Sequence, residues 1–394
     1  MSKGRGALEG IRVLDVTQVM AGPFCAMQLC DMGADVIKVE PPGGDSTRRM
    51  AGASGTDSAA FNAVNRGKRG IVLDLKSRAG QQAFRRLLAT ADIVIENFRP
   101  GVMKDFTLDY ASLAPNHPGL IYASISGYGQ TGPYRTKGGF DLIAQGVSGL
   151  MSVTGEPARP PVKVGVPITD LGAAMFALAA ILAALHYRTR TGRGQYIDTS
   201  LVEAGLAFSV WESAQYFGEG VTPEPLGSAH RMLAPYQAIR CADGYITLGA
   251  ANDRLFERLC QLLGHPEWPN EPDFADATQR VKHRAALIAR IEAITTLESR
   301  QQWLDRLEAH GIPCGPINNY AEAFADPQTL AREMVVEIDH PALGKLHVPG
   351  SPIKMSETPP ALGRHAPLLG EHTGEVLREA GCSDEEIAAA MRSN

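Results

Sequence analysis

The chain has 394 residues, a formal net charge of -5 and a pI near 6.1, with 44% hydrophobic and 21% charged residues. This composition is typical of a globular enzyme, and the acidic balance argues against a general nucleic-acid-binding protein. The length is large for one hydrophobic core and predicts two domains. No apolar run follows the first residues, so no signal peptide is expected.

Cysteines and histidines give no sign of a disulfide framework or a metal site. The six cysteines are spread over the chain without a CxxC pair, and we therefore expect reduced thiols and a cytoplasmic location. The ten histidines form no HxxxH or HExxH pattern, so no metal ligand set is predicted.

Short apolar strands alternate with helices over the first 125 residues. Ala21, Gly22 and Pro23 are predicted to form a turn before the first helix, and Ser77 is predicted to cap the second. Strands are expected at 11–16, 36–39, 71–75, 93–95 and 120–125, and helices at 24–32 and 77–90. This alternation predicts parallel βαβ units and an α/β fold, in which ligands bind beyond the carboxyl ends of the strands.

Basic residues gather near the expected carboxyl ends of these strands. A solvated basic turn explains any one of them, but as a group in an acidic protein they predict a site for a phosphorylated ligand. They are Arg48, Arg49, Arg66, Lys68, Arg69, Arg99 and Lys104.

Residues 127–132 match the G-x-G-x-x-G pattern and follow a strand. A dinucleotide-binding fingerprint must open a helix, whereas residues 133–139 have the composition of a loop. The pattern therefore argues against an NAD-dependent oxidoreductase, and the glycines are expected to let the backbone pass close to another group.

The most apolar helix that the sequence predicts covers residues 171–185. Its residues are good helix formers without charge, so it is expected to be buried, and it is predicted to be too short for a bilayer, which needs roughly 20 residues. Asp170 stands at its start. It is either an ordinary N-cap or an ionised carboxylate at the positive end of a buried helix, available as a nucleophile. The local sequence leaves both interpretations open.

A second, smaller α+β domain is predicted after this helix. A helical stretch at 201–217 leads into a segment rich in proline and glycine. A hairpin over 234–248 and helices at 253–263, 279–296 and 299–310 follow. The tail is predicted to hold a helix near 328–333, strands near 334–338 and 345–348, and a last helix.

Several segments, in their order and spacing, resemble the family III CoA-transferases, the group of formyl-CoA transferase, carnitine CoA-transferase and the α-methylacyl-CoA racemases. The segments are 10–15, 21–23, 33–40, 65–74, 92–101, 191–195 and 367–373. The resemblance covers essentially the whole chain and implies an interlocked homodimer. It implies a large Rossmann-like CoA-binding domain (1–200), a linker (201–225), a small α+β domain (226–320) and a return segment (321–394) that completes the large domain.

The resemblance also assigns site residues. The catalytic aspartate of the family falls on Asp170, with coenzyme A or acyl-CoA as substrate. A CoA-binding arginine of formyl-CoA transferase falls on Pro41, so Arg48 or Arg49 is the candidate replacement. The other expected CoA contacts are Met20, Arg69, Leu73, Lys76, Asn97, Phe98, Arg99, Lys104, Gly138, Gly139 and Phe140.

Position 140 discriminates within this family, because the racemases carry a histidine there as a proton-transfer partner of the aspartate. Phe140 cannot move a proton. We therefore expect CoA transfer from an acyl-CoA to a carboxylic acid through an aspartyl anhydride and thioester, rather than racemisation. A non-catalytic CoA-binding protein remains the other alternative. No metal, nucleic acid or membrane partner is expected.

The start of the small domain resembles the succinyl-CoA:dicarboxylate members, such as glutarate CoA-transferase. The segments that carry this likeness are 227–231, 235–238 and 315–319. The candidate substrate residues are Gly227, Ser228, His230 and Arg231. Backbone N–H groups at the start of the helix that follows Asp170 and in residues 227–229 are expected to face an oxyanion, and His230 and Arg231 to hold a second carboxylate.

Overall fold

The computed structural model describes residues 6–50 and 57–392. Residues 1–5, on which the expected absence of a signal peptide rests, lie outside this part. The described chain forms two compact units. The first comprises residues 6–50, 57–149, 164–208 and 327–392, and the second comprises residues 150–163 and 209–326. The second unit therefore also includes residues 150–163 and much of the predicted linker.

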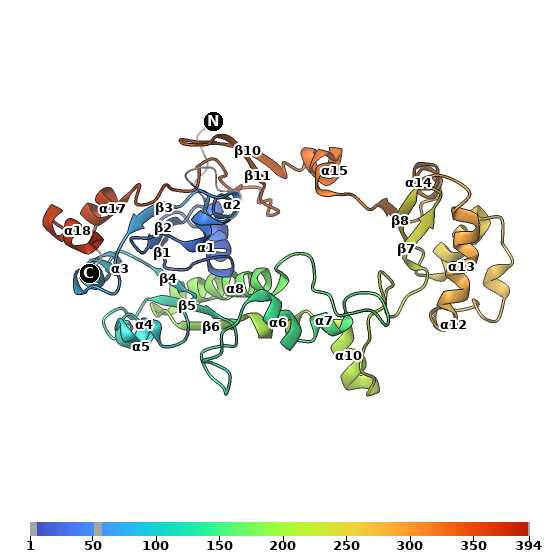
Figure 1. Ribbon diagram of the computed structural model, residues 1–394, viewed down its shortest axis with the longest axis horizontal. Coiled ribbons are helices and arrows are strands. Elements are labelled where there is room, and N and C mark those ends of the chain that lie inside the picture. The colour runs from blue at the N-terminus through green and yellow to red at the C-terminus, as the bar shows by residue number, and fades with distance from the viewer. Residues whose placement is uncertain (1–5, 51–56, 393–394) are drawn as a thin grey trace. The chain divides into compact units, whose positions relative to one another are not determined.

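A six-stranded parallel sheet forms the centre of the first unit (Figure 1). The order is β3-β2-β1-β4-β5-β6, and every neighbouring pair is parallel. The strands are β1 (Arg12–Asp15), β2 (Asp35–Glu40), β3 (Arg69–Val72), β4 (Ile93–Glu96), β5 (Ile121–Ser126) and β6 (Tyr196–Ser200). The predicted α/β fold is confirmed, and the strand order reverses between β1 and β4, where open α/β sheets bind ligands.

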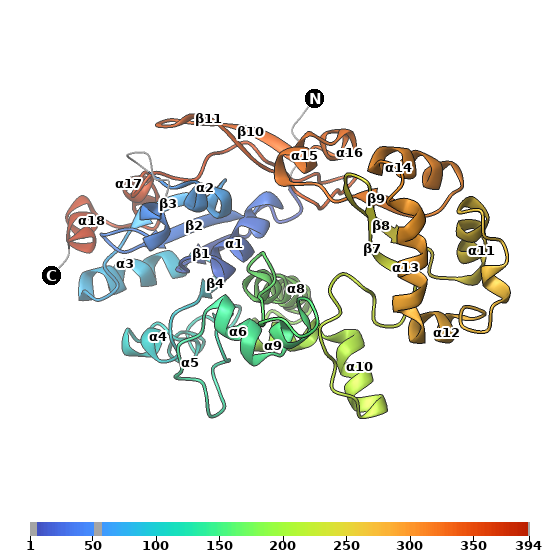
Figure 2. The same ribbon diagram turned by 45° about the vertical axis from the view of Figure 1, so that its right-hand side comes forward.

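Helices cover both faces of this sheet, so its strands are apolar on both sides. Val13 and Leu14 are both fully buried but belong to two different clusters, one on each face. One face packs against α1 (Ala21–Asp31) and α8 (Ile168–Thr191). The other packs against α3 (Arg78–Leu88) and the C-terminal α17 (Thr373–Glu379) and α18 (Asp384–Met391). Figure 1 and Figure 2 both show α18 beside α3.

Several predicted boundaries are wrong. Residues 21–23 form the first turn of α1 rather than a turn before it, because a proline in the first turn removes an N–H that has no helical partner. The strand predicted at 71–75 is β3, which begins and ends earlier. Helix α8 begins before Asp170, and its N-cap position is Pro167. The N-cap interpretation of Asp170 is therefore wrong, since this residue lies within the first helical turn.

Helix α8 also corrects the expectation about its length. It has 24 residues and a mean hydropathy of 2.0 over its most apolar window, which is enough by length and composition to cross a membrane. The core helix of a globular protein passes the same test. Here α8 packs against α1, β5, β6 and α9 (Leu201–Ala207), and Ala173, Ala177 and Ile181 have no exposed surface.

The second unit is built around a small antiparallel sheet, β7 (Tyr236–Cys241), β8 (Gly244–Gly249) and β9 (Cys314–Pro316). The predicted hairpin of β7 and β8 is confirmed. The helix predicted at 279–296 is interrupted at His283. The helices of the second unit are α7 (Leu150–Val153), α10 (Val210–Glu219), α11 (Asp253–Leu262), α12 (Ala277–Lys282), α13 (Arg284–Thr295), α14 (Arg300–Ala309) and α15 (Tyr320–Ala325). Phe256, Trp268 and Trp303 lie in its core.

The remaining elements belong to the first unit. The predicted pair of strands in the tail is an antiparallel hairpin of β10 (Val335–His340) and β11 (Gly344–Pro349). The other helices are α2 (Ala59–Asn65), α4 (Val102–Asp105), α5 (Tyr110–Leu113), α6 (Asp141–Val147) and α16 (Pro327–Ala331). All six cysteines are free, as predicted.

Candidate functional site

The loops that follow β1 and β4 are joined at the point where the strand order reverses. The Asn97 side chain accepts a hydrogen bond from Gln18 N at 2.8 Å and donates one to Gln18 O at 2.7 Å. Met20 ends the loop after β1 and occupies the N-cap position of α1. The predicted contacts Met20 and Asn97 therefore lie on two loops that the fold ties together at the expected ligand-binding edge.

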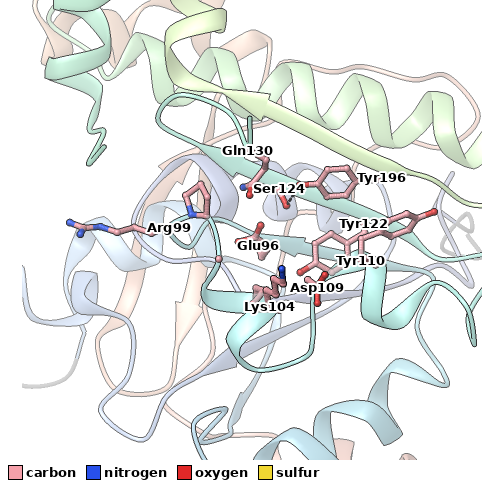
Figure 3. A pocket seen from close by; sticks show the side chains of 13 residues that line it. Glu96, Arg99, Lys104, Asp109, Tyr110, Tyr122, Ser124, Gln130 and Tyr196 are labelled. Carbon is pink, nitrogen blue, oxygen red and sulfur yellow. Dashed lines mark hydrogen bonds between the residues drawn. The ribbon is translucent and has the colours of Figure 1, made fainter. Parts of the chain in front are cut away.

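Two cavities open on either side of the segment that follows β4. The first, which we call the Leu73 cavity, has a volume of about 210 Å³. Three predicted contacts, Leu73, Lys76 and Phe98, line it together with Gln18 and Pro41. The second, the tyrosine cavity, has about 300 Å³ and is lined by Arg99, Lys104, Glu96, Tyr110, Tyr122, Tyr196, Ser124 and Gln130, among others (Figure 3).

The G-x-G-x-x-G segment is a loop, as predicted, and no helix begins until Asp141. Gly127 lies backbone to backbone against Gly139, since a Cβ on Gly127 would be 2.7 Å from the Gly139 Cα. A Cβ on Gly138 would lie 3.6 Å from Arg99 Nη2. The structure therefore brings Gly138 next to Arg99, while Phe140 is 73% exposed.

Three cations at this edge have no acidic partner. Within residues 6–50 and 57–392, Lys76, Arg99 and Lys104 form no ion pair, and all three are exposed. Such unpaired cations beside cavities at the carboxyl ends of strands favour an anionic ligand. The same described ranges contain no cluster of three or more His, Cys, Asp or Glu with metal-binding geometry.

The rest of the basic group is not where the sequence predicted. Arg66, Lys68 and Arg69 lie at the amino end of β3, because the strand begins at Arg69. Arg69 pairs with Asp35, Glu375 and Glu379 at 2.7, 2.9 and 2.8 Å. These carboxylates occupy its guanidinium group, so the assignment of Arg69 to the CoA site is corrected to a structural role.

Arg48 is also corrected to a structural role. Its Nη2 lies 2.6 Å from Glu40 Oε2 and its Nη1 2.8 Å from Asp57 Oδ1. The guanidinium is buried over the Phe61 ring, 3.7 Å from the ring centroid. It is therefore not available to a phosphate. Arg49 is exposed and donates a hydrogen bond to Gly43 O at 2.8 Å.

Asp170 lies half-buried in the first turn of α8. Burial raises its pKa to about 7, and the negative charge of Asp141 contributes to the same shift. A carboxylate that is held in this way is more basic than one in water, and it becomes fully ionised only above neutral pH. The group can therefore act as a nucleophile or as a proton acceptor.

Asp141 fixes the start of α8, a role that no local sequence pattern predicted. Its Oδ1 accepts hydrogen bonds from Thr169 N at 3.0 Å and Thr169 Oγ1 at 2.7 Å. Gln145 donates to Asp141 Oδ2 at 2.7 Å and accepts from Val164 N at 2.8 Å. Helix α6 thus binds the chain before Pro167, at Val164, and after it, at Thr169. The only sequence signal was an acidic residue next to Phe140, because Thr169 is 28 residues away in the chain.

The loop from Gly227 to Leu233 carries the predicted substrate residues in the second unit. Gly227 N donates to Gly155 O at 2.8 Å, and Ala229 N donates to Leu226 O at 3.0 Å. These two N–H groups are engaged within the fold, so the expectation that they face an oxyanion is corrected. Ser228 Oγ accepts a hydrogen bond from Ala238 N at 3.1 Å.

Arg231 lies in this loop above a second arginine that the sequence analysis missed. Arg231 Nε is 3.5 Å from Glu212 Oε1, and its Nη2 donates to Glu224 O at 2.9 Å. Arg284, on α13, donates from Nη2 to His230 O at 2.5 Å. Both Nε atoms are buried without a hydrogen bond. Burial lowers the pKa of Arg284 and the charge of Arg231 lowers it further, so the two guanidinium groups are near each other, and Glu212 is the one carboxylate paired with them within the described residues. This excess of positive charge favours the binding of a further anion.

Comparisons with known proteins show the family of the chain. The profile of the family described as CoA-transferase family III matches residues 8–373. A succinyl-CoA:mesaconate CoA-transferase of Haloarcula marismortui is 43% identical, over 95% of this chain and 97% of its own length. A succinate–glutarate CoA-transferase of Agrobacterium fabrum is 42% identical, over 96% and 97%. The human succinyl-CoA:glutarate CoA-transferase is 40% identical, over 98% and 89%.

Solved structures give the same result for the fold. The crystal structure of a CAIB/BAIF family protein from Brucella suis superposes with a TM-score of 0.84 at 40% identity, covering 95% of this chain and 100% of that one. The crystal structure of Rv3272 from Mycobacterium tuberculosis superposes with a TM-score of 0.85 at 28% identity, covering 94% and 98%.

Proposed function

The chain belongs to CoA-transferase family III and is a CoA-transferase, and we propose that it uses Asp170 to move coenzyme A between succinyl-CoA, or another dicarboxyl-CoA, and a free dicarboxylic acid. The observation that carries this proposal is the half-buried Asp170, with its pKa raised to about 7, in the first turn of an apolar helix. Glutarate and mesaconate are the acceptors named for similar proteins, and they are the first acids to test.

The proposed reaction begins when the ionised Asp170 carboxylate attacks the carbonyl carbon of the donor thioester. A carbon–oxygen bond forms, the carbon–sulfur bond breaks, and CoA leaves as a thiolate. The thiolate then attacks the aspartyl carbonyl of the resulting mixed anhydride. This step releases the donor acid as a carboxylate and leaves an aspartyl-CoA thioester.

The acceptor acid reverses these two steps. Its carboxylate attacks the aspartyl thioester, releases the thiolate and forms a second anhydride. The thiolate attacks the acceptor's acyl carbon, so that the new acyl-CoA leaves and Asp170 is regenerated as a carboxylate. No proton is gained or lost in this sequence. The absence of a titratable side chain at Phe140 is compatible with it, whereas racemisation requires a second proton-transfer group.

The Leu73 cavity and the unpaired cations support a CoA site at the carboxyl ends of β1 to β4. We propose that the nucleotide end of CoA lies at Leu73, Lys76 and Phe98, and that Arg99 adds positive charge from the segment after β4. A Cβ would approach Arg99 at Gly138, so glycine at that position leaves room for a ligand beside the guanidinium.

We further propose that Arg231 binds a carboxylate of the dicarboxylic acid, and that Arg284 holds the loop of Arg231 in place. In the Arg231→Ala variant, kcat/KM for glutarate is expected to fall by roughly 10- to 150-fold, the range for losing one charged hydrogen bond. Butyrate has no second carboxylate, so its transfer is expected to change less than about threefold. Initial rates with succinyl-CoA and each acid measure this.

A matched control comes from Arg290, an exposed arginine on α13 that pairs with Glu271 at 2.8 Å. The Arg290→Ala variant is expected to treat both acids as the unmodified protein does. Equal losses for glutarate and butyrate in Arg231→Ala would refute the specificity role of Arg231.

We propose a homodimer as well, because the first unit exposes large apolar side chains on α6, α8 and α9, which contact one another. Leu142, Met175 and Leu206 on these helices are 51%, 45% and 54% exposed. Apolar surface of this kind is typical of a subunit interface. Light scattering on the purified protein is expected to give twice the mass of the chain, and a monomer at micromolar concentration would contradict the proposal.

The class of reaction is tested by mixing the protein with succinyl-CoA and a panel of carboxylic acids. Chromatography with mass detection is expected to show a new acyl-CoA for at least one dicarboxylic acid, together with free succinate. If CoA binds but no acyl-CoA forms from any donor and acceptor in the panel, a non-catalytic CoA-binding role replaces the proposal.

A further inference from the structure

The tyrosine cavity is a site that the proposed CoA transfer does not use in full. Its lining comes from β4, β5 and β6, from the segment 99–111 and from Gln130 in the loop after β5, all in the first unit. Glu96 forms part of the wall and is only 4% exposed. The segment that follows β4 contributes residues to this cavity and to the Leu73 cavity. No single residue that the structure describes lines both cavities.

The polar groups on the wall of the cavity include donors without a partner. Gln130 Nε2 is buried and makes no hydrogen bond within the described residues. Lys104 likewise has no acidic partner among the described residues. Its amino group points toward Glu96, whereas the Arg99 side chain points away from the cavity (Figure 3). Glu96 Oε2 accepts a hydrogen bond from Phe98 N at 2.8 Å. A buried donor without a partner is rare in a folded protein and indicates a missing acceptor.

Aromatic rings form the rest of the wall. Tyr110 stacks on Tyr196 with 5.5 Å between centroids and 27° between planes, and Tyr122 lies 6.0 Å from Tyr196. The Tyr196 hydroxyl donates to Ser124 Oγ at 3.1 Å, so it is already engaged. The cavity thus presents flat apolar surface on one side and hydrogen-bond donors on the other, which is the usual design of a small-molecule site.

We propose that the tyrosine cavity binds a small carboxylic acid with a flat apolar body, of the size of benzoate. The ligand carboxylate accepts hydrogen bonds from Gln130 Nε2 and Lys104 Nζ and from Glu96 in its protonated form. The apolar body packs against the tyrosine rings. The volume of about 300 Å³ is at the lower limit for ligand pockets, so it suits such an acid and excludes a whole acyl-CoA.

Glu96 makes this binding depend on pH. Burial raises its pKa to about 7, and Asp198 on β6 adds to the shift, while hydrogen bonds from Ser124 and from Phe98 N oppose it. The other ionisable residues that line the cavity are Lys104, Asp109, Tyr110, Tyr122 and Tyr196, together with Arg99, whose side chain points away. An ionised Glu96 repels the ligand carboxylate, so the protonated form binds. The dissociation constant is therefore expected to rise about tenfold from pH 6 to pH 8.

Calorimetric titration of the full chain with sodium benzoate, without CoA, tests the proposal. Benzoate is expected to bind at one site per chain, more tightly at pH 6 than at pH 8. Glu96→Gln keeps a donor but cannot ionise, so it is expected to bind equally at both pH values. Gln130→Leu removes the unpartnered donor and is expected to weaken binding about tenfold or more at both.

Glu337→Gln is the matched control, since Glu337 is an exposed glutamate on β10 that pairs with Lys345. It is expected to keep the affinity and the pH dependence of the unmodified protein. Circular dichroism establishes that each variant is folded. Absence of binding at millimolar benzoate at pH 6 overturns the proposal. So does binding that neither Glu96→Gln nor Gln130→Leu alters, or binding that CoA displaces completely, because benzoate then occupies another site.

Discussion

Replacing Asp170 with asparagine is expected to lower CoA transfer by about four orders of magnitude or more, the scale observed when a covalent nucleophile is removed. An amide does not displace a thiolate, so neither the anhydride nor the aspartyl thioester forms. The fold is expected to persist, because Asp170 is not the N-cap of α8 and forms no ion pair with any residue that the structure describes. Asparagine also has nearly the same shape as aspartate.

Intact-protein mass spectrometry after addition of succinyl-CoA and quenching with hydroxylamine or borohydride measures the covalent step directly. The unmodified protein is expected to carry a trapped modification that maps to Asp170, and Asp170→Asn to carry none. Asp384→Asn is the matched control, since Asp384 also lies in the first turn of a helix, α18. Undiminished transfer by Asp170→Asn would refute the nucleophile assignment.

The raised pKa of Asp170 adds a pH signature. The proposed nucleophile must be ionised to react, so kcat/KM is expected to fall as the pH drops below about 7. Burial is the larger cause of the shift and Asp141 the smaller. Asp141→Asn is therefore expected to move this fall to lower pH without abolishing it. The pKa of Asp170 in the folded protein lies above its value in the unfolded chain, so its ionisation lowers the stability of the fold as the pH rises from about 4 to 7. The Asp170→Asn variant is expected not to lose stability in this way.

The sheet could be predicted because local patterns carry it. Apolar strands separated by helical segments specify a parallel sheet. The aspartate before a long apolar run left an N-cap and a nucleophile open for Asp170, and only the family resemblance favoured the nucleophile. The exact first turn of α8 could not be predicted, because Asp141 sets it through Thr169, a partner 28 residues away. Helix α8 was also longer than its uncharged stretch, since residues beyond Leu185 continue the helix to Thr191.

Basic residues were the least predictable part of the site. Arg48, Lys68 and Arg69 look like ligand-binding cations in the sequence, yet each finds carboxylates inside the fold. Their partners lie up to 310 residues away, and no local pattern shows which cations will be paired. Arg284 was missed for the same reason, because it approaches the loop at His230 from a distant helix.

Replacing Lys68 with methionine is expected to destabilise the first unit by about 3–5 kcal/mol, the range for leaving one charge of a buried ion pair without its partner. Lys68 and Asp15 are both fully buried, with 2.7 Å between Nζ and Oδ2. Lys68 also donates to Pro23 O at 3.0 Å and to Asn65 Oδ1 at 2.8 Å. Methionine fills the space but replaces none of these hydrogen bonds.

The expected loss depends on pH through Asp15. Burial alone would raise the pKa of Asp15, but Lys68 and Lys38 together outweigh burial and hold it below its usual value. Without Lys68 the folded pKa is expected to rise above the unfolded one. The destabilisation then appears as the pH rises above about 4 and is largest at neutral pH, whereas at lower pH a protonated Asp15 is tolerated.

Far-UV circular dichroism in urea and hydrogen exchange of the β1 amides measure this effect in the first unit. Tryptophan fluorescence does not, because Trp211, Trp268 and Trp303 all lie in the second unit. Lys345→Met is the matched control, since its lysine is 67% exposed and its ion pair with Glu337 is expected to contribute less than about 1 kcal/mol.

A second variant separates the charge from the packing. Asp15→Asn combined with Lys68→Met leaves no ion in the site and is expected to recover much of the lost stability, because the main penalty is the unpaired carboxylate. If the double variant is no more stable than Lys68→Met, the loss comes from packing instead. Asp15 ends β1, directly before the loop that Asn97 ties to β4. The buried pair therefore supports the edge of the sheet at which we propose that CoA binds.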